Sequence, residues 1–366
     1  MKKIHLSRRK KHHARKAGLP PGALVYIGNV APEQNQPAKI SKISYDSNEI
    51  TECELTPKAL ANFKPNPHQK HWLNLHGVHD VALVKQIGEA FNLHPLVIED
   101  ILNTEQRPKI DEFDHYVFLE TRLFYYHQES MSVSSEQISM VLGSNFLLTF
   151  QERSTGAFEP VRERLRASRA QMRTLGIDYL AYALLDSIVD KYFNVLEEVG
   201  EASETLEEQL LTKPTNAELH SIHQLKHVSI ELRRAVWPLR EVINTLTRNE
   251  KGFFQPATMP YLRDVYDHTV NFIESLESIR DSLSGMMDIY MASVSQRVNL
   301  ELRALTVVAM LFMPATLIAG IFGMNFHYMP WLEDKHGFWW AISIMLSIAL
   351  VMVLIFWRRQ WLSSKT

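Results

Sequence analysis

The stretch from Ala304 to Leu332, ALTVVAMLFMPATLIAGIFGMNFHYMPWL, contains no Asp, Glu, Lys or Arg. A second uncharged run, from Gly337 to Trp357, follows after a short acidic loop at 333–336. A bilayer core needs roughly 20 apolar residues of helix, and both runs are long enough. The sequence therefore predicts a hairpin that crosses a membrane twice. Gly323-Met324-Asn325 lies at its turn, where amide groups would stand at a pore mouth.

The composition excludes several classes of protein. At 366 residues the chain is too long for one ordinary core, so two or three units are expected. The net charge of −2 argues against nucleic acid as a partner. Cys53 is the single cysteine, which excludes an internal disulfide or a Cys-cluster metal site. The sequence has no Walker, HExxH or Gly-x-Ser-x-Gly motif, so we expect no enzyme and no organic cofactor.

Flanking charge predicts the orientation. Arg297 and Arg303 precede the first span, and Arg358 and Arg359 follow the second. By the positive-inside rule both termini are cytoplasmic and the acidic loop is external. Residues 1–30 show no signal peptide. The basic segment within residues 1–20 is either a solvated tail or a contact with anionic lipid.

The pattern along the chain predicts strands with interspersed helices up to about residue 155 and helices thereafter. Helices are expected at 159–174, 179–211 and 217–246, with a kink or break at Pro238. From about Tyr261 apolar residues recur every three or four positions, and the pattern continues into the first span without a cap. One helix of about sixty residues, roughly 90 Å long, is predicted. A helix with so regular an apolar stripe needs partners, either neighbouring helices or copies of itself.

The predicted organisation has seven parts. They are a basic tail at 1–20, a cytoplasmic α/β domain at 21–155, a cytoplasmic helical region at 156–260, a stalk helix continuing into the first span at 261–323, an external loop at 324–337, a second span at 338–358, and a basic cytoplasmic tail at 359–366.

The segment Phe322-Gly-Met-Asn-Phe-His-Tyr-Met-Pro330 combines Gly-Met-Asn with Phe-x-x-Met-Pro at the end of the first span. Other segments, in the soluble part, resemble the same family and occur in the same order as in that family. They include His94-Pro-Leu-Val-Ile-Glu-Asp-Ile-Leu-Asn103, Gln106-Arg-Pro-Lys109 and Trp237-Pro-Leu-Arg-Glu-Val242. Over most of residues 70–362 the chain resembles the CorA family of magnesium transport proteins. The resemblance implies a homopentameric funnel in the inner (plasma) membrane. Each subunit would have an α+β cytoplasmic part, an α/β/α sandwich, followed by long helices and a C-terminal two-helix transmembrane hairpin.

The resemblance implies a selectivity filter at Gly323, Met324 and Asn325. Mg²⁺ holds its water tightly and prefers octahedral oxygen ligands. A ring of Asn325 carbonyl oxygens could accept hydrogen bonds from that water without removing it. The same asparagine could also cap the helix, and the two roles are compatible. The family's pore face corresponds to Asn299, Leu302, Leu305, Met313, Thr316 and Gly320, where apolar rings could close the pore by dewetting.

The resemblance also implies regulatory cation sites between subunits. Asp100 and Asp288 match one such site, while Glu99, Asp186 and Asp264 match a second set. Facing carboxylates repel each other unless a dication neutralises them, so bound Mg²⁺ would hold the funnel closed. Mg²⁺ is thus expected both as cargo and as regulator.

Two other functions remain open. The related zinc-transporting branch shares the tripeptide and the topology, although Phe-x-x-Met-Pro favours magnesium. A non-conducting membrane anchor that only oligomerises is the other alternative. The aligned polar residues Asn325 and Thr316 argue against an anchor facing lipid. The residues do not rank Mg²⁺, Co²⁺, Ni²⁺ and Zn²⁺ as cargo.

Overall fold

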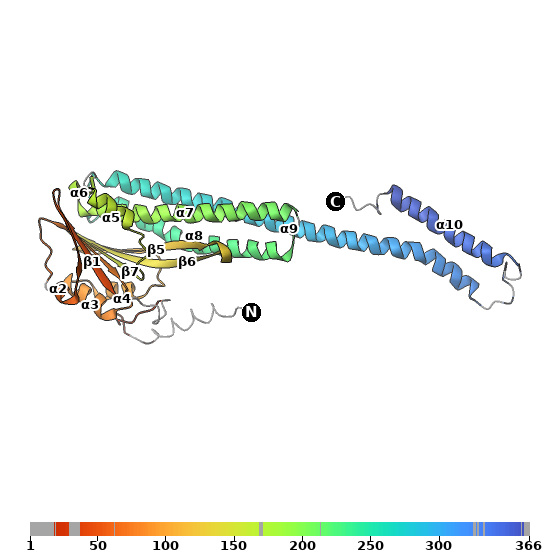
Figure 1. The fold of residues 1–366 in the computed structure, drawn as a ribbon, viewed down its shortest axis with the longest axis horizontal. Helices are drawn as coiled ribbons and strands as arrows, with labels where there is room; N and C mark the ends of the chain where they lie inside the picture. The colour runs from red at the N-terminus through yellow and green to blue at the C-terminus, as the bar shows by residue number, and fades with distance from the viewer. Residues whose placement is uncertain are drawn as a thin grey trace. The chain divides into compact units, whose positions relative to one another are not determined.

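A computed structural model describes residues 18, 20–28, 37–61, 63–167, 171–212, 214–324, 327, 329–331, 334–359 and 361. The chain forms two compact units, which meet between Gly285 and Met286, within a helix. Each unit is described separately, and Figure 1 gives the elements and their labels.

A seven-stranded sheet forms the centre of the first unit, in the order β2-β1-β3-β7-β6-β5-β4. All neighbouring strands are antiparallel except β3 and β7, which are parallel. β3 is buried on both sides over its five central residues, so helices must cover both faces of the sheet. The strands are β1 (Lys39–Tyr45), β2 (Ile50–Leu55), β3 (Lys70–His76), β4 (Lys109–Glu112), β5 (Tyr116–His127), β6 (Ser132–Gly143) and β7 (Phe146–Gln151).

Short helices cover one face of this sheet (Figure 1): α2 (Pro57–Ala61), α3 (Val81–Ala90) and α4 (Pro95–Leu102). Asp80 begins α3, because its carboxylate accepts a hydrogen bond of 3.0 Å from the Leu83 N–H. Val84 and Val97 are buried in the same core as Leu73 and Phe150 of the sheet.

The other face carries α5 (Glu159–Arg166), α6 (Gln171–Thr174), α7 (Ile177–Thr212) and α8 (Asn216–Arg248). The Tyr192 hydroxyl donates to the backbone carbonyl of Arg122, and its ring packs 5.6 Å from that of Phe124. A short 3-10 helix, η2 (Gln128–Ser130), joins β5 to β6. Helices on both faces of a sheet make the predicted α/β/α sandwich.

One predicted helix is divided, and another continues through its proline. The helix expected at 159–174 is divided into α5 and α6. Pro238 does not break α8, which continues to Arg248 and ends at Asn249 in the left-handed conformation (φ 50°). Leu232, Val236 and Leu239 around the proline are fully buried, so packing outweighs the missing backbone hydrogen bond.

The long helix predicted from Tyr261 is present as α9 (Met259–Phe322), 64 residues without interruption at Pro314. In the first unit, its Phe272 ring lies 5.7 Å from Tyr192 and 5.9 Å from Phe193 on α7. The second unit contains the rest of α9 and α10 (Gly337–Arg358).

Both α9 and α10 are long and apolar enough to cross a membrane, with mean hydropathies of 2.2 and 2.5 in their most apolar stretches. Those stretches are 0% and 6% buried within the chain, so neither behaves as the core helix of a soluble protein. The chain therefore has the two apolar helices that the predicted hairpin requires.

Candidate pore helix and regulatory cation site

The Gly-Met-Asn tripeptide begins where α9 ends. The Gly323 N–H donates to the Ala319 carbonyl at 2.9 Å, and the Met324 N–H donates to the Ile321 carbonyl at 3.2 Å. A Cβ at Gly323 would lie 3.1 Å from the Ala319 oxygen, so this last turn favours glycine. Asn325 lies outside the described residues, and its role at the filter stays a prediction.

The predicted pore residues share one face of α9. At 100° per residue they fall within an arc of about 120°. All are exposed in the single chain: Asn299, Leu302, Leu305, Met313, Thr316 and Gly320. Leu305 and Met313 are 66% and 67% exposed, which is unfavourable for apolar side chains unless another helix or lipid covers them.

Two positions on this face carry a small or polar residue. A Cβ at Gly320 would meet nothing within 4 Å among the described residues, so packing within the chain does not require glycine there. The Thr316 hydroxyl donates to the Phe312 carbonyl at 2.9 Å, which satisfies its proton locally. Its oxygen can still accept a hydrogen bond from water.

Asp100 on α4 is held by two side chains. Lys109 Nζ lies 2.5 Å from Asp100 Oδ2, and Gln106 Nε2 donates to Asp100 Oδ1 at 2.6 Å. The Asp100 side chain is 15% exposed, so it retains a narrow opening to solvent. Neither Lys109 nor Gln106 was predicted as part of the site, although both lie in the segment 106–109 that carried the resemblance.

Glu99, the neighbour of Asp100, has a different environment. Its Oε2 accepts a hydrogen bond of 2.5 Å from the backbone N–H of Gly22, near the start of the described chain. Glu99 lies on α4, whereas Asp186 lies on α7, which covers the other face of the sheet. Within one chain, the fold therefore does not bring Glu99 to Asp186, and their grouping in one site between subunits stays a prediction.

Asp186 and Asp264 do interact within one chain. Burial raises the pKa of Asp186, and the charges of Asp190 and Asp264 raise it further, while Arg164 and His268 act in the opposite direction. Asp264 Oδ2 lies 3.8 Å from His268 Nε2, one turn along α9. Neighbouring carboxylates repel one another when ionised, which favours the protonated form of Asp186.

Asp288 is exposed on α9 in the second unit. Within the described part of the chain, no group of three or more His, Cys, Asp or Glu side chains could hold a metal ion.

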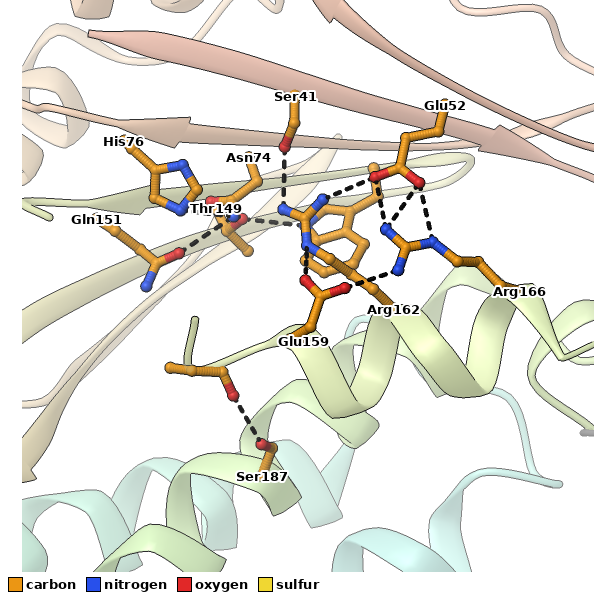
Figure 2. A network of polar contacts seen from close by, with 12 residues as sticks. Ser41, Glu52, Asn74, His76, Thr149, Gln151, Glu159, Arg162, Arg166 and Ser187 are labelled. Atoms are coloured by element: carbon orange, nitrogen blue, oxygen red, sulfur yellow. Dashed lines mark hydrogen bonds and ion pairs between the residues drawn. The ribbon is translucent and has the colours of Figure 1, made fainter. Parts of the chain in front are cut away.

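A separate polar network joins α5 to the sheet (Figure 2). The Arg162 guanidinium lies 4.8 Å from the Trp72 ring and donates to Glu52 Oε1 at 3.3 Å. Arg166 donates to both Glu52 oxygens and, at 2.6 Å, to Glu159. A pocket of about 460 Å³ opens beside this network. Because its two arginines and two nearest glutamates pair with each other, we interpret the network as structural.

Comparisons with known proteins show the family to which this chain belongs. The family described as CorA-like Mg²⁺ transporter protein matches residues 68–360. The cobalt/magnesium transport protein CorA of Thermotoga maritima is 41% identical over 95% of this chain and 98% of its own length. The chain therefore belongs to the CorA-like Mg²⁺ transporter family, whose members are membrane transporters rather than enzymes.

Solved structures agree on the fold. The CorA magnesium transporter from Methanocaldococcus jannaschii superposes with a TM-score of 0.73 at 21% identity, covering 87% of this chain and 98% of its own. The cytoplasmic domain of ZntB from Vibrio parahaemolyticus has a TM-score of 0.56 at 14% identity, covering 70% of this chain and 98% of its own. At these identities the likeness concerns the fold alone.

Proposed function

We propose that the chain is a subunit of a homopentameric channel for hydrated Mg²⁺, which also passes Co²⁺ and Ni²⁺. The observation that carries this proposal is α9, one continuous 64-residue helix from the packed first unit to Gly-Met-Asn. The exposed face of α9 needs partners, and a closed symmetric ring of copies supplies them. The family supplies the number five. The 41% identity to a protein named for cobalt and magnesium transport supports the cargo.

In this channel, Asn325 carbonyl oxygens from the subunits face the axis beyond the end of α9. They bind the first-shell water of the ion rather than the ion itself. Neutral amides favour a dication without trapping it, which conduction requires. Below the filter, Leu302, Leu305 and Met313 form the apolar constriction, and Thr316 and Gly320 lie between them and Asn325.

Cytoplasmic Mg²⁺ regulates the channel in this proposal. Asp100 of one subunit and Asp288 of its neighbour share a dication, with Glu99, Asp186 and Asp264 as a second set. Removing the ion leaves carboxylates facing one another, which favours an open funnel. The exposed position of Asp288 and the narrow opening to solvent at Asp100 support this arrangement. The channel lies in the inner (plasma) membrane with both termini in the cytoplasm, as the flanking basic residues favour.

Zinc transport is the first alternative. A ZntB cytoplasmic domain shares the fold, but its 14% identity gives no support for zinc as the cargo. A non-conducting anchor is disfavoured by Thr316 and Gly320, which lie on one exposed face of the span.

Flux measurements in proteoliposomes test the function. Wild type is expected to take up Mg²⁺ faster under an inside-negative potential, and cobalt hexaammine outside should block it. Asn325→Ala should abolish uptake while the oligomer stays intact, because it removes the polar ring and little packing. The matched control is Asn271→Ala, the same change at an exposed position of α9 in the first unit. Full uptake by Asn325→Ala would refute the filter, and a detergent-corrected monomer mass would refute the ring.

A further inference from the structure

The ammonium of Lys109 occupies the position where a cation would bind Asp100. Lys109 begins β4, and its Nζ lies 2.5 Å from Asp100 Oδ2 on α4. Gln106 Nε2 binds the other oxygen at 2.6 Å. Both oxygens of a carboxylate that is only 15% exposed are thus engaged from within the chain. A dication approaching Asp100 meets a positive charge already in contact with it.

The Lys109 ammonium also lies close to an aromatic ring. Its Nζ lies 5.6 Å from the centre of the Phe118 ring. The Lys109 side chain is 32% exposed, so its ammonium lies partly out of water beside the Asp100 carboxylate. In the structure the two groups therefore form a close ion pair.

A second carboxylate can receive the ammonium when it leaves Asp100. Asp111 Oδ2 lies 3.2 Å from Lys109 Nζ, and the Asp111 side chain is 46% exposed. Lys109 can thus move toward Asp111 without becoming an unpaired charge. Exchange between Lys109 and an incoming cation at Asp100 needs only a side-chain movement.

We propose that Lys109 is a tethered competitor of Mg²⁺ for Asp100 and thereby sets the Mg²⁺ concentration at which the regulatory site fills. This inference rests on the proposed regulatory role of Asp100. Lys109 acts through Asp100 and is not itself a ligand. Without the Lys109 ammonium, the negative charge of Asp100 would not be neutralised from within the chain. Mg²⁺ would then fill the site at a lower concentration. With the ammonium in place, the ion must displace an internal counter-ion, which moves the threshold upward.

The test is a Mg²⁺ titration of protease resistance on the purified full-length protein. Lys109→Met keeps the length and apolar stem of the side chain and removes its charge. We expect its midpoint of protection to fall on the order of tenfold, within the range usual for coupled sites. Lys109→Arg should keep a midpoint near that of wild type.

Two controls separate competition from a general effect. Lys85→Met removes another lysine paired with a carboxylate, Glu89 at 3.7 Å on the surface of α3, and should leave the midpoint unchanged. In an Asp100→Asn background, Lys109→Met should have no further effect, because the pair acts as a unit. Thermal unfolding of each variant identifies any that fails to fold, in which case Lys109→Gln replaces Lys109→Met.

Each outcome has one meaning. An unchanged midpoint in Lys109→Met and Lys109→Gln would overturn the inference while leaving the regulatory site in place. A raised midpoint would also overturn it, because Lys109 would then position Asp100 for the ion. Absence of any Mg²⁺-dependent protection in wild type would refute the regulatory part of the proposed function itself.

Discussion

Asp178 Oδ2 accepts a hydrogen bond of 2.6 Å from the Thr258 hydroxyl. The same oxygen accepts another, of 2.9 Å, from the backbone N–H of Gln255. Asp178 is in the first turn of α7 and only 2% exposed, and Thr258 immediately precedes α9 and is fully buried. This carboxylate therefore fixes the start of the long helix to the sandwich.

Asp178→Ala should destabilise the folded chain by about 2–4 kcal/mol, since it leaves a buried hydroxyl and a backbone N–H without their acceptor. The melting temperature of the purified protein should fall by about 5–10 °C. Asp114→Ala is the matched control, because Asp114 is 86% exposed and pairs with Lys251 at 3.2 Å on the surface. Surface pairs of that kind contribute about 0–1 kcal/mol. Equal effects of the two changes would contradict the role of Asp178.

Glu136 should make stability depend on pH. Burial raises its pKa to about 7, against the lowering effect of the Arg153 N–H that donates to it at 2.7 Å. Below about pH 4.5 the group is protonated in both states and contributes nothing. As pH rises from 4.5 to 7, only the unfolded state ionises freely, so stability falls by up to about 3 kcal/mol.

Glu136→Gln removes this titration and keeps an oxygen that can accept from Arg153. The variant should match wild type near pH 4.5 and be more stable than wild type above pH 7. Unfolding measured across this range checks the prediction, with Glu129→Gln at an exposed position as the control. If the difference in unfolding free energy between wild type and Glu136→Gln does not change with pH, Glu136 ionises at its ordinary pKa.

Much of the fold follows from apolar periodicity. The long helices and the uncapped α9 are visible in the sequence because their stripes extend over many turns. Pro238 does not break α8 because the buried Leu232 and Leu239 pack around it, and local helix propensity takes no account of such packing. The division between α5 and α6 depends on the ends of two short helices, which carry little periodic signal.

The candidate site was less predictable. Asp100 and Asp186 could be named because they match family segments, but the pattern said nothing of what surrounds them. Lys109 reaches Asp100 only because the turn between α4 and β4 places the two side by side. Glu99 and Asp186 were grouped by resemblance, yet they lie on helices at opposite faces of the sheet. In the proposed site the ligands come from several subunits, so no spacing within one sequence would reveal them.

The apolar face of α9 gives a prediction about conduction in the proposed channel. Leu302→Asn should let water into the constriction and raise Mg²⁺ flux at high internal Mg²⁺, where wild type is closed. Leu300→Asn is the control, since at 100° per residue Leu300 lies about 160° from the centre of the pore face. Proteoliposome flux measures both. An equal increase in the two variants would indicate general disruption of the helix rather than hydration of a pore.

Asp288 gives the prediction about gating. Asp288→Lys places a permanent positive charge where the proposed dication would lie, so closure should lose much of its dependence on Mg²⁺. Wild type should resist protease in millimolar Mg²⁺ and become cleavable on chelation, and Asp288→Lys should show much less contrast. Asp281→Lys is the matched control, an exposed aspartate two turns earlier on α9 whose side chain is 72% exposed. If Asp288→Lys retains the full wild-type contrast, the sensor lies elsewhere, with Glu99, Asp186 and Asp264 as the next residues to change.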